Sequence, residues 1–118
     1  MRTVNNYIES IGRYVEYRVG QHAQENMELI AASRPEDLWF HIREKPSCHV
    51  VATLPPHHPT YDKKQLKKIA VQGAVVCKQF SKYKSEHHVS VIYTPISNVV
   101  ATATVGSVLV DKYYTIVL

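Results

Sequence analysis

One long helical pattern, over residues 63–83, most constrains how this chain can fold. Its apolar residues recur at the spacing that places them in one sector of an α-helix: Leu66, Ile69, Ala70, Gly73, Val76, Cys77 and Phe80. The segment PPHHPTYD, residues 55–62, separates this helix from what precedes it, because its prolines lack the backbone N–H that a strand or helix needs. We therefore expect a single long helix that packs through its apolar sector onto a sheet.

Segments with the two-residue alternation of β-strands flank the helix on both sides. The predicted strands before it lie at residues 4–8, 13–19, 37–42 and 49–54, and those after it at residues 89–94, 99–104, 107–110 and 113–117. The first two form a hairpin, the last two form a terminal hairpin around Asp111-Lys112, and residues 23–32 suit a short helix. This order predicts an α+β fold: a mostly antiparallel β-sheet with one long helix packed on a face and a short helix after the N-terminal hairpin.

Length and composition are those of a soluble single domain over residues 1–118. Hydrophobic residues make up 45% of the chain and charged residues 20%, a balance typical of globular proteins. No apolar run approaches the roughly 20 residues that cross a bilayer, and the N-terminus lacks the apolar core of a signal peptide. We therefore expect no membrane contact and an intracellular, cytoplasmic location, with Cys48 and Cys77 as reduced thiols.

The charges of the predicted helix gather on the side opposite its apolar sector. They are Lys64, Lys67, Lys68, Lys78 and Lys82, which fall within about 100° of arc. A solvated face explains this pattern. A phosphate-binding ridge also explains it, because aligned ammonium groups can follow a nucleic-acid backbone and displace its counterions. Val71 and Val75 interrupt the lysines, which leaves open a surface for a protein partner or for self-association.

The stretch DLWFHIREKPSCHVV, residues 37–51, concentrates the side chains with reactive chemistry. His41 and His49 could meet across a hairpin and serve as acid and base for RNA cleavage, which makes a nuclease the less favoured alternative. Strand alternation places Trp39 and His41 opposite Phe40, and it points Cys48 and His49 to opposite faces. We therefore expect no catalytic residue, no metal site with its four convergent ligands and no cofactor.

The same stretch carries a family resemblance. EDLWFHIREKPSCHVV resembles the D-[LI]-W-F-H…S-H-V signature of the NFACT-R domain, which occurs in ribosome-associated quality-control factors that extend stalled nascent chains and in small stand-alone proteins. VGQHAQENMELI, VSVIYTPISNVV and VGSVLVDKYYTIVL are similar to other parts of the family, so the resemblance runs from about residue 15 to the C-terminus. The positions that match the family pattern are Gly20, Asn26, Asp37, Trp39, Phe40, His41 and His49.

The resemblance implies an α+β domain that binds RNA, with the ribosome or tRNA as targets and no catalysis by the module itself. Together with the helix pattern, it predicts phosphate binding by the five lysines named above and by a second patch, Arg43 and Lys45, in the turn after the signature strand. Lysine–phosphate contacts do not read the 2′-hydroxyl, so DNA is an alternative to RNA. The alternative to nucleic-acid binding is a protein-interaction module, which binds a protein partner or forms a homodimer.

Three features depart from the family pattern. The family usually has Gly before Ser-His-Val, whereas here Cys48 stands between Ser47 and His49. The family's Gly-Arg-Asn opening reads Gly20-Gln21-His22, so an expected cation is missing. The N-terminal domain and coiled coil of the large factors are not expected in this chain, and neither is nascent-chain extension of the kind those factors perform.

Overall fold

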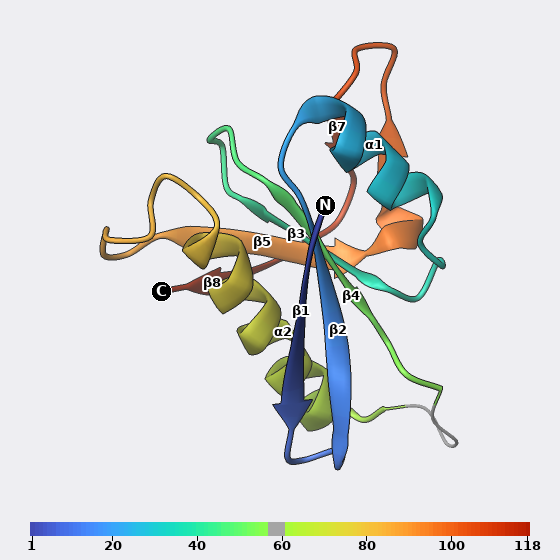
Figure 1. Ribbon diagram of the computed structural model, residues 1–118, viewed down its shortest axis with the longest axis vertical. Helices are drawn as coiled ribbons and strands as arrows, with labels where there is room; N and C mark the ends of the chain where they lie inside the picture. Colours follow the sequence, from blue (N-terminus) through green and yellow to red (C-terminus); the bar gives the residue numbers. More distant parts are fainter. Residues whose placement is uncertain (57–60) are drawn as a thin grey trace.

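Six antiparallel strands form the main sheet, and each of its faces carries one helix (Figure 1). The computed structural model describes residues 1–56 and 61–118, so His57 and His58 of the predicted loop lie outside the described residues. The strands are β1 (Arg2–Ile8), β2 (Arg13–Gly20), β3 (Leu38–Ile42), β4 (His49–Thr53), β5 (Ser90–Pro95), β6 (Val99–Ala101), β7 (Val108–Val110) and β8 (Tyr114–Val117). The helices are α1 (Ala23–Ala31), α2 (Lys63–Gln79) and the short 3-10 helix η1 (Ile96–Asn98). The predicted α+β fold is confirmed.

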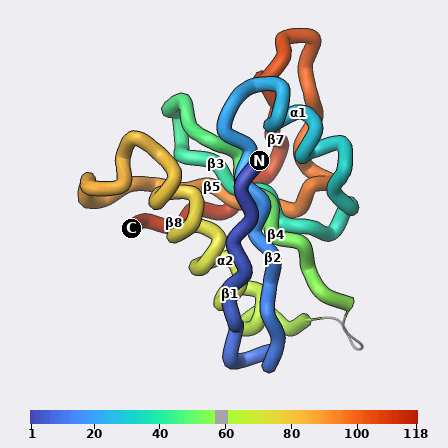
Figure 2. Tube along the Cα trace, viewed as in Figure 1, coloured from blue at the N-terminus to red at the C-terminus, as the bar shows by residue number. Residues whose placement is uncertain are grey.

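The strand order of the main sheet is β1-β2-β4-β3-β5-β8, and β6 and β7 form a separate two-stranded sheet. The prediction of a terminal hairpin was therefore wrong: β7 pairs with β6, while β8 pairs with β5 as an edge strand (Figure 2). The β5–β8 register sets Val91 opposite Ile116, and both side chains are buried. The Thr94 hydroxyl donates a 2.7 Å hydrogen bond to the Lys112 carbonyl, which ties the connecting segment to β5.

Helix α2 starts as the sequence indicates and ends earlier. Asp62 caps its N-terminus in a capping box with Gln65, each side chain bonding the other residue's backbone N–H. The helix ends at Gln79 rather than at residue 83, so the predicted end was wrong. The hydroxyl of Ser81 donates to the Lys78 carbonyl at 2.7 Å and accepts from the Tyr83 N–H at 3.1 Å. These bonds replace the next helical turn, as serine side chains often do near helix ends.

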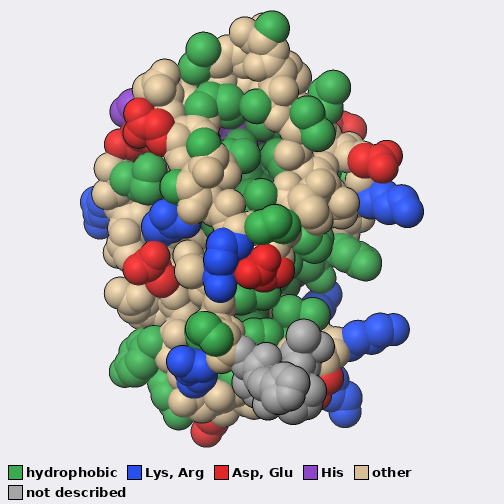
Figure 3. Space-filling view, turned by 90° about the vertical axis from the view of Figure 1, so that its right-hand side faces the viewer, with side chains coloured by type: hydrophobic (Ala, Val, Ile, Leu, Met, Phe, Trp, Pro, Cys, Tyr) green, Lys and Arg blue, Asp and Glu red, His purple; other side chains and the backbone are tan. Residues whose placement is uncertain are grey.

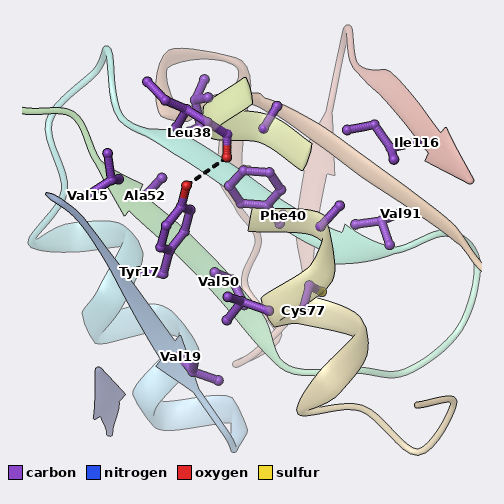
Figure 4. Close-up of a cluster of buried hydrophobic side chains, with 14 of the residues drawn as sticks. Val15, Tyr17, Val19, Leu38, Phe40, Val50, Ala52, Cys77, Val91 and Ile116 are labelled. Atoms are coloured by element: carbon purple, nitrogen blue, oxygen red, sulfur yellow. Dashed lines mark hydrogen bonds between the residues drawn. The ribbon is translucent and has the colours of Figure 1, made fainter. Parts of the chain in front are cut away.

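Two hydrophobic clusters hold the sheet between its helices. The larger lies under α2 and contains Phe40, Tyr17 and Ile69, and the Tyr17 hydroxyl donates to the Ile69 carbonyl at 2.8 Å (Figure 4). The smaller lies on the opposite face, where Trp39 packs with Leu29 of α1. Neighbouring residues of β3 thus anchor the two faces of the sheet, as strand alternation predicted.

Candidate nucleic-acid interface

The sequence of α2 contains no acidic residue and five lysines: Lys63, Lys64, Lys67, Lys68 and Lys78. Lys64, Lys67 and Lys68 are exposed, and Lys78 is half-buried. Among the residues that the structure describes, no lysine of α2 forms an ion pair. These ammonium groups are therefore not neutralised within the domain, and each can contact an external phosphate.

The positive charge of α2 is a local feature of the surface. Acidic and basic side chains lie interspersed across the face of the molecule in Figure 3. The apolar interruption within the lysine face is mainly Val75, whose side chain is 41% exposed, because Val71 packs against the main core. The outer surface of α2 thus has a basic character with one exposed valine in it.

Cations from other parts of the chain join the C-terminal end of α2. The Lys45 ammonium lies 4.7 Å from the centre of the Tyr83 ring, and the Arg2 guanidinium lies 5.2 Å from the centre of the Phe80 ring. Lys82 is exposed just beyond the last helical turn. Arg2 was not among the predicted residues, because its place beside Phe80 depends on how β1 lies relative to the helix and leaves no local sequence signal.

The two residues of the predicted second patch lie in different surroundings. Lys45 sits against Tyr83 beside the end of α2, whereas Arg43 pairs with the carboxylate of its neighbour Glu44 at 3.9 Å. Both partners of that ion pair are exposed, so the pair contributes little to stability. It nevertheless places negative charge beside Arg43, so Lys45 is the better placed of the two for a phosphate.

Three signature residues, Trp39, His41 and His49, converge on the face of the sheet opposite α2. The Trp39 indole N–H donates to Nδ1 of His49 at 3.1 Å, which leaves the ring proton of neutral His49 on Nε2. The His41 ring stacks on Trp39 with 5.6 Å between ring centres, and it meets His49 edge-on at 5.1 Å. These three side chains line an open groove of about 530 Å³ beside β7.

The histidines meet across the β3–β4 pair, as the nuclease alternative requires, and both rings are perturbed by burial. Burial, and then the neighbouring charge of His41, lower the pKa of His49 to about 3. Burial also lowers the pKa of His41, against the smaller opposing effect of the Ile42 carbonyl. The surroundings of both rings therefore favour the neutral imidazole over the imidazolium ion.

The remaining signature residues join secondary-structure elements. The side-chain oxygen of Asn26 accepts the His49 backbone N–H at 3.3 Å, and a Cβ at Gly20 would come within 2.5 Å of that oxygen. The buried carboxylate of Asp37 accepts the backbone N–H groups of Arg34 at 2.9 Å and of Leu54 at 3.1 Å. These contacts fix the junctions that α1 and β3 make with their neighbouring strands.

The two cysteines are neighbours in space although they are 29 residues apart in sequence. Both are buried and free, and Sγ of Cys48 lies 3.6 Å from the Cys77 carbonyl oxygen.

Among the described residues, no group of three or more His, Cys, Asp or Glu side chains is arranged to hold a metal ion. No helix in the described part of the chain is long and apolar enough to span a membrane.

The chain folds as a small α+β domain, and the lysines of its longest helix form no ion pair among the described residues. A family model described as the NFACT protein RNA binding domain matches residues 6–112, and the chain belongs to that family. The match begins earlier than the resemblance seen in the sequence, within β1, and it ends at residue 112, before β8. The description of the family assigns it RNA binding.

The chain is also similar to curated relatives and, in its fold, to a solved structure. The chain is 33% identical over 94 residues to coiled-coil domain-containing protein 25 of Danio rerio, and 31% identical over 90 residues to the protein of that name in Bos taurus. Each match covers 72% of this chain and 41% and 40% of the relatives, so the chain spans under half of their length. The C-terminal part of the fibronectin/fibrinogen-binding protein of Streptococcus suis shares the fold, with a TM-score of 0.75 at 23% identity over 97% of this chain and 44% of that one.

Proposed function

We propose that this domain binds RNA through phosphate contacts along the lysine face of α2. The observation that carries the proposal is a helix with five lysines, no acidic residue and no ion pair to those lysines among the described residues. The family description supplies RNA as the ligand class. Lys64, Lys67, Lys68 and Lys78 would contact phosphates along the helix, and Lys82, Lys45 and Arg2 would extend the contact beyond its C-terminal end.

The proposal extends to structured cellular RNA, with tRNA and ribosomal RNA as the first targets to test. An intracellular, cytoplasmic setting belongs to the same proposal, since such RNA is found there and buried thiols remain reduced. DNA is the alternative ligand, because ammonium–phosphate contacts do not distinguish the two sugars. Direct competition between RNA and DNA strands of one sequence measures that preference.

Binding of a labelled tRNA should weaken steeply as salt rises from about 50 to 300 mM, because bound phosphates release counterions. With roughly four phosphate contacts, log K plotted against log salt should have a slope of about −3. The variant Lys67→Gln/Lys68→Gln should reduce the magnitude of this slope by about 2. It should also weaken binding at 0.1 M salt by roughly ten- to a hundredfold. Fluorescence anisotropy at several salt concentrations measures both quantities.

The matched control is Ala31→Glu/Ala103→Glu, which places two charges on exposed positions outside α2. Each double variant lowers the formal net charge by two, from +4 to +2, so a difference between them reports position rather than total charge. Equal weakening by both variants would contradict a contact along α2. Absence of binding at low salt, or binding that is indifferent to salt, would refute the proposed function itself.

Self-association is the second candidate function, and the exposure of Val75 on the outer face of α2 favours it. An apolar side chain at the centre of a charged helix face is a plausible contact between two copies. Sedimentation at several protein concentrations tests this candidate. A monomer throughout the micromolar range would exclude it, and Val75→Ser should dissociate any dimer that forms through this face.

A further inference from the structure

Three aromatic rings stand in a row on the α2 face of the sheet. The strand registers pair Phe40 with Tyr93, and Tyr93 with Tyr114. The ring centres are 5.8 and 5.4 Å apart, and the ring planes differ by 27° and 28°, which is the geometry of offset stacking. The row therefore runs across β3, β5 and β8 as one continuous stack.

Exposure increases along this aromatic row. Phe40 is fully buried under α2, Tyr93 is half-buried, and Tyr114 is 65% exposed. Strand β8 is the last strand in the sheet order, so no further strand among the described residues pairs beyond it. The outer face of the Tyr114 ring is thus the open end of the stack.

The arrangement of α2 shows which of its lysines lie nearest this open end. Lys68 and Gln72 line a hollow with the end of β1, and the Gln65 side chain donates to the Ser10 carbonyl at 3.4 Å. That flank of the helix faces β1, at one edge of the sheet. Because β8 forms the other edge, the opposite flank of α2 faces β5 and β8.

The flank that faces β5 and β8 carries Lys67 and Lys78 at the angles that the helical period assigns to them. Ala74, which lies between them in sequence and on the same flank, is fully buried and belongs to the larger hydrophobic cluster. Neither lysine forms an ion pair among the described residues. Two cations without an ion pair among the described residues therefore lie on the side of α2 directed toward the sheet edge at which the aromatic stack ends.

We propose that Tyr114 is a stacking platform for an unpaired RNA base, with Lys67 and Lys78 holding the phosphates next to that base. A base on the outer face of Tyr114 would continue the Phe40–Tyr93–Tyr114 stack past the sheet edge. Stacking of this kind accepts any base, since every base has a π-face, and it requires that the base be free of a partner strand. The inference rests on the proposed RNA binding and names its target class: single-stranded segments or loops rather than continuous duplex.

The test compares a 12-nucleotide single-stranded RNA with a blunt duplex of equal phosphate number. Tyr114→Ala should weaken binding of the single strand about tenfold, because one stacked base is lost. It should leave binding of the duplex and the salt slope unchanged. Tyr114→Phe keeps the ring and should bind as the wild type does. Tyr14→Ala is the matched control, since Tyr14 is a similarly exposed tyrosine, at 67%, that instead pairs edge-on with Tyr7.

The outcomes separate this inference from the function on which it rests. No salt-dependent binding of either RNA by the wild-type domain would refute the proposed function. Normal salt-dependent binding with an unchanged affinity in Tyr114→Ala would overturn only the stacking platform. Equal losses of affinity for the single strand and the duplex in Tyr114→Ala would also overturn it. A Tyr114→Ala variant with altered self-association but unaltered RNA affinity would do the same. Tyr114→Thr, which retains β propensity, serves in place of the alanine variant if that variant unfolds.

Discussion

Replacement of Gly73 by alanine should lower the free energy of unfolding by about 3 kcal/mol, although alanine is the better helix former by about 1 kcal/mol. A Cβ at this position would lie 2.2 Å from Cζ of Phe40 and within 2.6 Å of both Cε atoms. The Phe40 ring is fully buried and stacks on Tyr93, so it has no free space into which to move. Urea denaturation of the wild type and the variant measures the difference.

A double-mutant cycle with Phe40→Leu tests the cause of this destabilisation. Leucine lacks the Cζ and Cε atoms that the new methyl group would meet, so Gly73→Ala should cost much less in the Phe40→Leu background. The coupling between the two substitutions should then be favourable by about 1–3 kcal/mol. An alanine variant as stable as the wild type would show that α2 can move away from the sheet without loss.

Most of the fold follows from patterns that act over a few residues. Alternation in β3 placed Trp39 and Phe40 on opposite faces, and the helical period placed the lysines of α2 on its outer surface. Such predictions succeed because side-chain direction is fixed by local backbone geometry. The structure confirms the first placement, with Trp39 in the smaller cluster and Phe40 in the larger. Lys64, Lys67 and Lys68 are exposed as expected, whereas Lys78 is half-buried and Lys82 lies beyond the end of the helix.

The errors concern choices that distant residues decide. Residues 107–117 read as a hairpin because two short apolar runs flank Asp111-Lys112, yet β8 pairs with β5 and buries Ile116 under the α2 face. Pairing with β5 gives β8 a place in the main core, which a hairpin with β7 would not. The end of α2 depends similarly on the hydroxyl bonds of Ser81, which no helical period reveals.

The residues of the candidate site likewise divide into those that the sequence predicts and those that only the tertiary structure reveals. Its lysines are visible in the sequence, but their assignment to phosphates stays a prediction, as do the roles of Arg43 and Lys45. The approach of Arg2 to Phe80 and the row from Phe40 to Tyr114 arise from strand order, which the sequence alone does not specify. Arg2 and the aromatic row that ends at Tyr114 therefore became identifiable only from the sheet topology.

Acidification from pH 7 to pH 4 should lower the free energy of unfolding by about 3 kcal/mol through His49 alone. The pKa of this histidine is lowered from 6.5 to about 3 in the folded protein, mainly by burial and then by the charge of His41. The unfolded chain therefore takes up the proton first. The stabilisation is complete above pH 6.5 and is lost at about 1.4 kcal/mol per pH unit as the pH falls towards 3.

The variant His49→Gln isolates this effect from the protonation of carboxylates, which both proteins share. Glutamine does not titrate, and its side-chain oxygen can still accept the Trp39 indole N–H that Nδ1 of His49 accepts. The stability difference between wild type and variant, from urea denaturation at pH 7, 5 and 4, should therefore shift by about 3 kcal/mol in favour of the variant. Identical pH dependence of the two proteins, or an NMR titration that gives His49 a pKa near 6.5, would show that burial does not hold the imidazole neutral.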